Sequence, residues 1–157
     1  MYYQIISTPI GPYLIVDSGA GISVVEHFEQ QTPKRKRALE QMENKETSII
    51  QAAILQLEEY FAGDRKTFDL PLDEQGTPFQ KQVWQALRAI PYGETRSYKE
   101  IAAAIDNPKA VRAVGLANNR NPICLFTPCH RVIGSDGSMT GYGGGMDAKI
   151  YLLKLEK

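Results

Sequence analysis

The stretch SYKEIAAAIDNPKAVRAVGLANN, residues 97–119, contains the signals for two short helices and the turn between them. Ser97 stands three residues before Glu100, which is the capping-box pattern, so a first helix is expected to begin there. The Asp-Asn-Pro sequence at 106–108 ends that helix and starts a second one, expected over residues 109–119. Two short helices joined by three residues are typical of a helix-turn-helix, although a purely structural helical pair fits the same pattern.

The second of these helices is rich in small residues, which would allow close approach either to another helix or to a nucleic-acid backbone. They are Ala110, Ala113, Gly115 and Ala117. Arg112 follows Val111 and stands two residues before Val114. Its helical position turns it away from the apolar face that these valines share, so the arginine is expected to face a ligand.

The rest of the second half also has helical patterns. Thr77 can cap a helix whose first position is Pro78, and residues 91–93, Pro-Tyr-Gly, end it. The apolar stripe of that helix is Phe79, Val83, Trp84, Leu87 and Ile90. A final amphipathic helix is indicated by the spacing of Ala148, Tyr151, Leu152 and Leu155.

The first half begins with strand patterns. Residues 2–6 and 13–16 flank a Thr-Pro-Ile-Gly-Pro turn at 8–12, and a third apolar run covers residues 22–28. Apolar residues then recur at helical spacing over residues 50–61. These patterns predict a small α/β unit with a short antiparallel sheet.

Two polar segments complete the first half. Residues 34–37, Lys-Arg-Lys-Arg, are interpreted as a solvated connection, with a nucleic-acid patch as the alternative. Residues 69–77, which include Pro71 and Gly76, are typical of a linker. We therefore predict an α+β protein with an N-terminal α/β domain over residues 1–70. A mainly helical C-terminal domain, containing a winged helix-turn-helix, is predicted over residues 78–157.

Composition narrows the class of protein. Of the 157 residues, 43% are hydrophobic and 23% charged, which suits an ordinary core and excludes fibrous or disordered chains. No apolar run reaches the roughly 18 residues of a membrane span, and the N-terminus lacks a secretory pattern. We expect a cytoplasmic protein with no membrane partner.

The cysteine and histidine content excludes two kinds of structural cross-link. The chain contains two cysteines, Cys124 and Cys129, and two histidines, His27 and His130. This set suits neither a disulfide framework nor a structural zinc site.

Charge is distributed unevenly between the two halves. Residues 1–77 hold 7 Lys and Arg against 12 Asp and Glu, whereas residues 78–157 hold 11 against 6. The first half therefore carries a net charge of −5 and the second half +5. A moderately basic half suits a polyanionic partner, although so small an excess does not identify one.

Residues 127–132, Thr-Pro-Cys-His-Arg-Val, are the segment best suited to chemistry. A cysteine reacts as its thiolate, which neighbouring cations stabilise, and Pro128 stiffens the approach to Cys129. His130 is the obvious base. Adjacent side chains of an extended segment point to opposite faces, so unless the chain turns sharply it acts through water or not at all. A buried, unreactive cysteine is the alternative.

Glu156 favours the reactive interpretation. It falls in the last turn of the final helix, where the helix dipole disfavours an anion by about 0.3–1 kcal/mol. An anion there indicates a pairing, for which His130 is the candidate, and a frayed, solvated helix end is the alternative. Cys124, between Ile123 and Leu125, is expected to be a small core residue.

Residues 128–132, Pro-Cys-His-Arg-Val, resemble the active-site signature of the O6-alkylguanine-DNA alkyltransferases, also called methylated-DNA–protein-cysteine methyltransferases. Further segments of residues 78–157 follow the order and spacing of that family. They are residues 79–84 with 90–93, Ser97-Tyr98 with Ile101-Ala102, residues 111–115, Asn121-Pro122, and Gly141-Tyr142 leading into Gly144-Gly145. Two positions depart from the family pattern: Thr127, where an apolar residue is usual, and Gly143, where many relatives have serine.

The resemblance implies a DNA repair reaction of a single turnover. Cys129 would irreversibly take an alkyl group from O6 of a guanine flipped out of duplex DNA, with O4 of thymine as a second candidate position. His130 would act through a water as base, oriented by Glu156, and Tyr98 would assist the departing guanine. Asn121 would hold the turns around the cysteine.

The resemblance also implies how DNA is bound. The second helix of the pair would enter the minor groove, where Ala113 and Gly115 allow close approach and Arg112 replaces the flipped base in the stack. Tyr142 would shape the lip of the pocket. The expected partner is double-stranded DNA containing O6-alkylguanine, bound by a monomer without cofactor or metal.

Two other classes of function remain open for this sequence. A non-catalytic alkylated-DNA sensor or DNA-binding regulator would keep the helical pair and Arg112 but would not need Cys129. A thiol hydrolase could use cysteine and histidine, but it would need an oxyanion hole, and no motif marks one.

Overall fold

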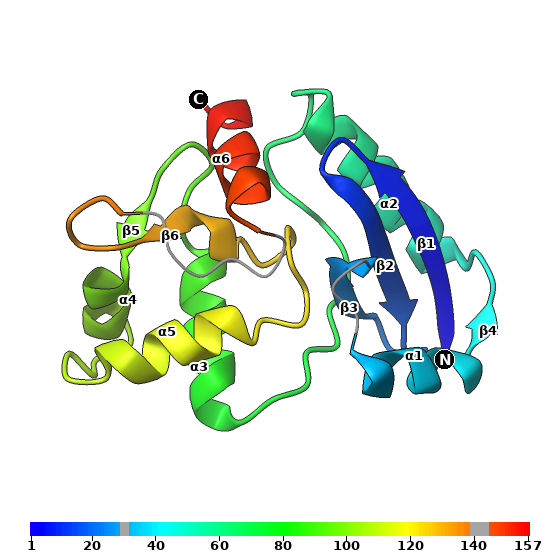
Figure 1. Cartoon of the computed structure of the whole chain (residues 1–157), viewed down its shortest axis with the longest axis horizontal. Coiled ribbons are helices and arrows are strands. Elements are labelled where there is room, and N and C mark those ends of the chain that lie inside the picture. Colours follow the sequence, from blue (N-terminus) through cyan, green and yellow to red (C-terminus); the bar gives the residue numbers. More distant parts are fainter. Residues whose placement is uncertain (29–31, 139–144) are drawn as a thin grey trace. The chain divides into compact units, whose positions relative to one another are not determined.

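The computed structural model of the chain describes residues 1–28, 32–138 and 145–157 (Figure 1). These residues form two compact units, Met1–Glu74 and Gln75–Lys157. Each unit combines helices with strands, which confirms the predicted α+β class. None of the helices in the described residues is both long enough and apolar enough to cross a membrane.

The first unit is built on a four-stranded sheet in the order β3-β2-β1-β4. The strands are β1 (Tyr2–Thr8), β2 (Gly11–Asp17), β3 (Ile22–His27) and β4 (Glu43–Asn44). β2 is antiparallel to both of its neighbours, with Ile15 opposite Gln4 of β1 and Val25 of β3. β4 runs parallel to β1, so the sheet is mixed and not purely antiparallel as predicted.

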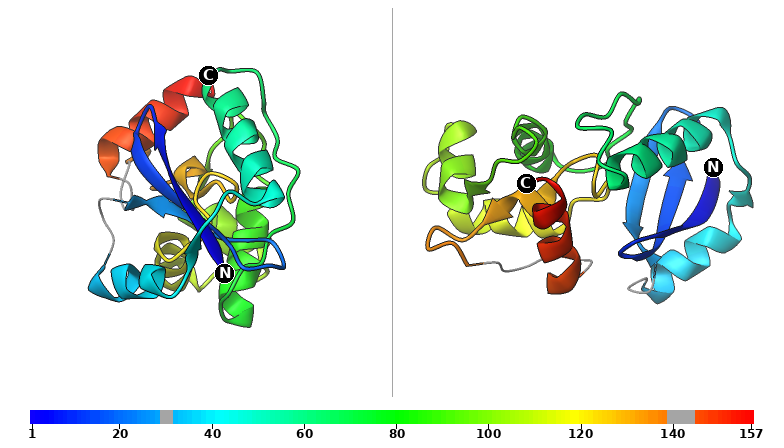
Figure 2. Two further views of the ribbon diagram at one scale, coloured as in Figure 1. Left: turned by 90° about the vertical axis from the view of Figure 1, so that its right-hand side faces the viewer. Right: turned by 90° about the horizontal axis from the view of Figure 1, so that it is seen from above.

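Helices cover both faces of this sheet (Figure 2). α1 (Pro33–Glu40) lies on one face and α2 (Ser48–Phe61) on the other. Residues 13–17 of strand β2 are all buried, which explains why residues 13–16 are apolar without alternation. On the α1 side, Leu14 and Val16 pack with the half-buried Leu39 and Met42.

Residues Lys34–Arg37 are solvated as expected, since three of the four are exposed, but they belong to the helix α1 and not to a simple connection. Thr32 is the N-cap, and its hydroxyl accepts the backbone N–H of Arg35 at 3.2 Å. Pro33 occupies the first helical turn, where its missing N–H is not needed. The cap and the proline outweigh the repulsion among four consecutive cations.

The segment predicted to be a linker also begins later than expected. The N–H of Ile22 in β3 donates to the Pro71 carbonyl at 2.9 Å, and the Asp73 N–H donates back to the Ile22 carbonyl at 2.8 Å. The side chain of Gln56 exchanges two hydrogen bonds, both 3.0 Å, with the backbone of Asp69. Residues 69–73 are therefore attached to the first unit.

The second unit contains four α-helices, a 3-10 helix and two short strands among its described residues. They are α3 (Pro78–Arg88), β5 (Arg96–Ser97), α4 (Tyr98–Ala104), α5 (Val111–Asn119), η2 (Cys129–Arg131), β6 (Val132–Ile133) and α6 (Met146–Leu155). Thr77 and Ser97 cap α3 and α4, each in a complete capping box, as their spacing predicts. The indole N–H of Trp84 on α3 donates to the Ala117 carbonyl on α5 at 2.9 Å, inside the core.

α4 and α5 form the predicted helical pair, but residues 105–110 join them, not three residues. Asp106 adopts a left-handed conformation (φ +62°), and the Asn107 N–H returns to the Ala102 carbonyl at 2.9 Å, which closes α4. A further turn follows, and α5 begins at Val111 without a side-chain cap. The Pro108 signal therefore marks this turn and not the start of the second helix.

β5 and β6 form a two-stranded parallel sheet beside the helices, with Arg96 opposite Val132 and Ser97 opposite Ile133. β6 directly follows the helix that contains Cys129, and α4 directly follows β5. The pairing therefore holds the start of α4 next to the segment that follows the nucleophile.

Trp84→Phe is expected to lower the free energy of unfolding of the second unit by about 1–3 kcal/mol, because it removes the hydrogen bond to Ala117 and part of the packing between α3 and α5. Urea unfolding followed by circular dichroism is the suitable measurement, since the variant loses the chain's one tryptophan. Leu116→Ala, at a side chain of α5 that is 52% exposed, is the control and should change the value by less than about 0.5 kcal/mol. Equal losses in the two variants would contradict the role given to Trp84.

Candidate active site

A tightly folded loop presents Cys129. Pro128 has φ −81° and ψ 68°, and the Cys129 N–H donates to the Thr127 carbonyl at 2.8 Å, which together define an inverse γ-turn. Cys129–Arg131 then form the 3-10 helix η2. The chain turns sharply at this point. The extended geometry that would point the side chains of Cys129 and His130 to opposite faces is therefore absent.

Asn121 holds this loop together. Its Nδ2 donates to the Thr127 carbonyl at 2.8 Å, and its Oδ1 accepts the N–H of Ile123 at 3.0 Å. Its side chain also forms a hydrogen bond with the side chain of Cys129. Asn121 thus joins the two ends of the loop that precedes Cys129.

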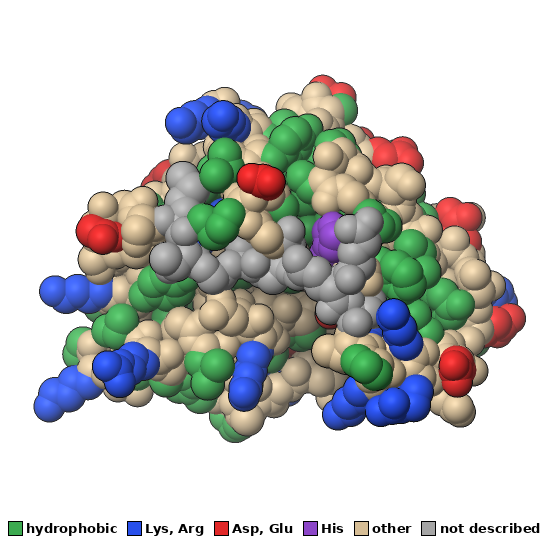
Figure 3. All heavy atoms as spheres, viewed as in Figure 1, with side chains coloured by type: hydrophobic (Ala, Val, Ile, Leu, Met, Phe, Trp, Pro, Cys, Tyr) green, Lys and Arg blue, Asp and Glu red, His purple; other side chains and the backbone are tan. Residues whose placement is uncertain are grey.

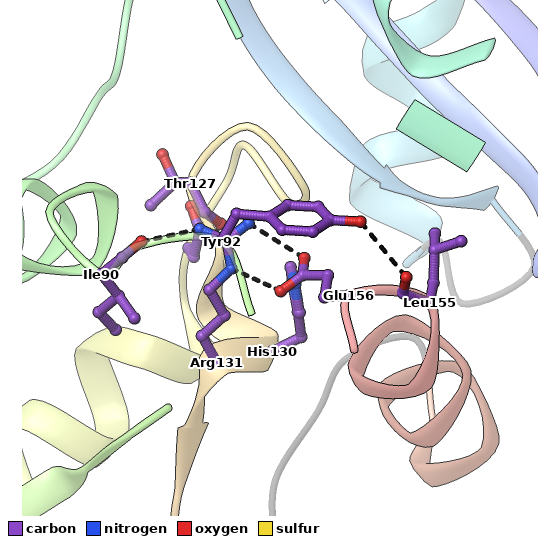
Figure 4. A network of polar contacts seen from close by, with 8 residues as sticks. Ile90, Tyr92, Thr127, His130, Arg131, Leu155 and Glu156 are labelled. Atoms are coloured by element: carbon purple, nitrogen blue, oxygen red, sulfur yellow. Dashed lines mark hydrogen bonds and ion pairs between the residues drawn. The ribbon is translucent and has the colours of Figure 1, made fainter. Parts of the chain in front are cut away.

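Glu156 is buried (4% exposed) as the C-cap of α6, and both of its carboxylate oxygens are paired (Figure 4). Its Oε2 lies 2.7 Å from Nε2 of His130. Arg131 donates from Nε to Oε1 at 2.8 Å and from Nη2 to Oε2 at 3.0 Å, and its Nη1 donates to the Ile90 carbonyl at 2.8 Å. Glu156 is therefore not at a frayed, solvated helix end.

The turn after α3 fixes the end of α6. The hydroxyl of Tyr92 donates to the Leu155 carbonyl at 3.3 Å, and the Tyr92 ring lies 5.7 Å from the guanidinium carbon of Arg131 (Figure 4). Burial, and then the charge of Glu156, raise the pKa of this tyrosine. Gly93 has φ +83°, and a Cβ there would lie 2.9 Å from the carbonyl oxygen of Glu156. Glycine is required both for this conformation and for this close approach.

The network determines the protonation of His130. Two arginine N–H groups keep Glu156 ionised, and a carboxylate only accepts, so Nε2 of His130 donates to it. Burial lowers the pKa of His130 and outweighs the opposing effect of Glu156. The ring is therefore neutral at pH 7, with a lone pair on Nδ1. That atom is buried and has no hydrogen-bond partner among the described residues, so it can act as a base.

Cys129 is 4% exposed, and its pKa is lower than that of an ordinary thiol. The largest cause is a hydrogen bond with the side chain of Cys124. Burial raises the pKa, whereas the hydrogen bond of Asn121 and the charge of Lys149 lower it. Lys149 is itself fully buried, with Nζ donating to the Val132 carbonyl at 2.6 Å. The thiol of Cys129 therefore ionises more readily than an ordinary cysteine thiol.

Sequence reasoning missed two of these contacts. Cys124 is not a simple core residue, because it is half-buried and hydrogen-bonded to the nucleophile. Lys149 is buried on α6, whereas Tyr151, predicted on the apolar stripe, is 39% exposed. The available signal was that Lys149 lies three residues before Leu152 and therefore on the same helix face.

Thr127 is accommodated as a polar residue. Its side chain is 1% exposed, and its hydroxyl accepts a hydrogen bond from Nη1 of Arg88 on α3 at 2.9 Å. The threonine at this position therefore adds a hydrogen bond between α3 and the loop, and its hydroxyl is satisfied.

The other predicted residues are distributed over α4 and α5. Tyr98 is the first residue of α4 and is half-buried, and a Cβ added to Gly115 of α5 would lie 3.8 Å from its ring. Arg112 and Ala113 are exposed on α5. Tyr142 lies outside the described residues. Among the residues that the structure does describe, no group of three or more His, Cys, Asp or Glu side chains could hold a metal ion.

Both parts of the chain match known protein families. Residues 78–157 match "6-O-methylguanine DNA methyltransferase, DNA binding domain", and residues 1–74 match "6-O-methylguanine DNA methyltransferase, ribonuclease-like domain". The chain is 53% identical over 161 residues to a methylated-DNA--protein-cysteine methyltransferase of Methanosarcina barkeri, covering 100% of this chain and 98% of that protein. It is 49% identical to the constitutive methylated-DNA--protein-cysteine methyltransferase of Bacillus subtilis, covering 99% and 95%.

Solved structures are similar over the whole chain. The crystal structure of Mycobacterium tuberculosis O6-methylguanine methyltransferase has a TM-score of 0.90 at 48% identity, covering 99% of this chain and 92% of that one. Mycobacterium tuberculosis OGT in complex with DNA has a TM-score of 0.90 at 46% identity, covering 100% and 93%. These similarities confirm the resemblance that the sequence motifs carry and extend it to the first unit. The chain belongs to the 6-O-methylguanine DNA methyltransferase family.

Proposed function

We propose that this protein repairs DNA by moving an alkyl group from O6 of guanine in a duplex to Cys129, once and irreversibly. The observation that carries this proposal is the buried His130–Glu156 pair next to a cysteine whose pKa is lowered. The relatives named methylated-DNA--protein-cysteine methyltransferase, and the similar protein solved with DNA, support the same reaction and partner. We assign the chemistry to the domain of residues 78–157. A sensor or regulator would need neither the pair nor the activated thiol.

The reaction is a displacement at the alkyl carbon. The neutral Nδ1 of His130 takes the proton of the thiol through a water, and Glu156 stabilises the imidazolium that results. The sulfur of Cys129 then bonds to the carbon while the bond from carbon to O6 breaks, and its electron pair passes to the guanine. Tyr98 donates a hydrogen bond or proton to the departing base. The product is a thioether, which is a poor leaving group, so each protein molecule acts once.

The thiolate is stabilised without exposure to bulk water. Cys124 and Asn121 hydrogen-bond to it, and the buried ammonium of Lys149 supplies the compensating charge. Because the site is largely dry, these interactions are stronger than they would be in solvent. A nucleophile held in this way needs little reorganisation when the alkyl carbon arrives.

DNA binding is assigned to α5 and the turn before it. Lys and Arg side chains lie over α4 and α5 at the lower left of Figure 3. The exposed basic residues of this region are Lys99, Lys109, Arg112 and Arg120. A base inside a duplex cannot reach a buried sulfur, and extruding it costs a few kcal/mol. We propose that a monomer binds double-stranded DNA containing O6-alkylguanine, with Arg112 in the vacated place in the stack and Ala113 and Gly115 close to the groove.

Incubation with duplex DNA containing O6-methylguanine is expected to add one methyl group to each protein molecule, at Cys129. Intact-mass measurement with peptide mapping follows the transfer. Cys129→Ala should abolish the transfer and leave DNA binding in place. Repair of several lesions by one protein molecule would contradict the single-turnover mechanism.

Glu156→Gln and His130→Ala are each expected to slow the transfer by about 10²–10⁴-fold, the usual contribution of a positioned base. The double variant should be little slower than the slower single variant, because the two residues act as one unit. Single-turnover rates provide the measurement, and thermal melts identify any variant that is unfolded. The exposed neighbour Lys157→Gln is the matched control and should react normally. A neutral Glu156→Gln would rule out the orienting role of the carboxylate.

Arg112→Ala is expected to weaken repair of duplex DNA by about 1–3 kcal/mol, the scale of lost stacking support. The reaction with the free base O6-benzylguanine should be nearly unchanged, because a free base needs no flipping. The two single-turnover rates are compared with those of Lys109→Ala, whose loss should weaken binding to all duplexes alike. Equal losses of Arg112→Ala on duplex and free base would mean that Arg112 supports the fold or the pocket.

A further inference from the structure

The loop before Cys129 is folded back on itself by a strained turn. Leu125 has φ +75°, and the Phe126 N–H donates to the Cys124 carbonyl at 2.9 Å, which is the pattern of a γ-turn with positive φ. Such a conformation is rare for a branched side chain and unfavourable by itself, so the surrounding structure must maintain it. Strain of this kind is concentrated at functional sites.

Several hydrogen bonds maintain the turn. The Thr127 N–H donates to the Ile123 carbonyl at 3.0 Å, and Cys124 and Thr127 form an isolated β-bridge. Asn121 binds the Thr127 carbonyl, and its own carbonyl lies 3.8 Å from the Cys124 sulfur. The inverse γ-turn at Pro128 then directs the chain back again. The two reversals bring Cys124 and Cys129 together, although five residues of an extended chain would separate them by well over 10 Å.

The two thiols are neighbours. A hydrogen bond with the side chain of Cys124 is the largest cause of the lowered pKa of Cys129, and neither cysteine forms a disulfide. Cys129 is buried and Cys124 is half-buried, so Cys124 is the more accessible of the two residues. The proposed alkyl transfer uses Cys129 and leaves the Cys124 sulfur unmodified. The thiol of Cys124 is therefore available for other chemistry.

A stabilised thiolate is also the form of cysteine that peroxides oxidise. The first product, a sulfenic acid, is reversible, but further oxidation to a sulfinic acid is in general permanent. For a protein that acts once, permanent oxidation removes a molecule that has repaired nothing. A neighbouring thiol can prevent this loss by condensing with the sulfenic acid.

We propose that Cys124 is a resolving cysteine, which captures a sulfenic acid on Cys129 as an intramolecular disulfide and so preserves the nucleophile during exposure to hydroperoxides. In the first step the Cys129 thiolate attacks a peroxide oxygen; the sulfur–oxygen bond forms, the oxygen–oxygen bond breaks and hydroxide or alkoxide leaves. In the second step the Cys124 sulfur attacks the Cys129 sulfur, and the hydroxyl group leaves with the Cys124 proton as water. A dithiol reductant then restores both thiols and becomes a disulfide itself.

The test exposes the purified full chain to an excess of hydrogen peroxide, enough to supply each Cys129 with several oxygen atoms, and measures intact mass and thiol content, without DNA. The wild type should lose two hydrogen atoms and show a peptide cross-linked between Cys124 and Cys129. Dithiothreitol should reverse both changes completely. Cys124→Ser retains a hydrogen-bond donor but cannot form the disulfide, so its Cys129 should gain two or three oxygen atoms that dithiothreitol does not remove. Cys129→Ser cannot form the cross-link, so it should not lose two hydrogen atoms under the same conditions.

A second readout uses the alkyl acceptor capacity that survives peroxide and subsequent reduction. It should be retained in the wild type and lost in Cys124→Ser. Oxygen addition at Cys129 of the wild type without a cross-link, or equal recovery of the two proteins, would overturn the proposal. The mass readout does not depend on DNA repair, so a protein that forms the disulfide but accepts no alkyl group would refute the proposed function alone.

Discussion

A carboxylate at the C-terminal end of a helix, away from water, is stable only if donors surround it, because both the helix dipole and desolvation disfavour the charge. Glu156 meets this condition through three N–H groups, one from His130 and two from Arg131. The third nitrogen of Arg131, Nη1, donates to the Ile90 carbonyl just after α3. One buried charge therefore joins the last helix, the helix of the nucleophile and the end of α3, and the position of Cys129 depends on this junction.

The same junction determines the chemistry of the site. An ionised Glu156 forces the proton of His130 onto Nε2, which leaves Nδ1 as the basic atom. Burial keeps this ring neutral at physiological pH. The arginine, by contrast, stays charged and balances the carboxylate, so the base and its partner can exchange a proton with the thiol without leaving an uncompensated charge. Orientation, tautomer and charge thus have one structural cause.

The loop before the nucleophile adds a second constraint. Two γ-turns, at Leu125 and Pro128, would be unfavourable in isolation, and the side chain of Asn121 bridges them. This loop places one thiol, that of Cys124, and one amide, that of Asn121, within hydrogen-bonding reach of the Cys129 sulfur. The resulting environment stabilises a thiolate for alkyl transfer. It also creates the contact between Cys124 and Cys129, which is why the proposed resolving role follows from the same geometry.

Local sequence signals determined the boundaries and the buried faces of several helices in this protein. Capping boxes at Thr77 and Ser97 and the apolar periodicity of the helices act within one or two turns, so they can be read directly from neighbouring residues. The motifs around Cys129 were enough to identify the family. The pairing of Glu156 with His130 was also predicted from the position of the anion at a helix end. Only the tertiary structure decided that Arg131 binds the same carboxylate, that Lys149 is buried and that Cys124 is a neighbour of the nucleophile. Such contacts depend on how α6 packs against η2 and how a strained loop closes. No periodicity within one element encodes these distances, because they result from the packing of several elements at once.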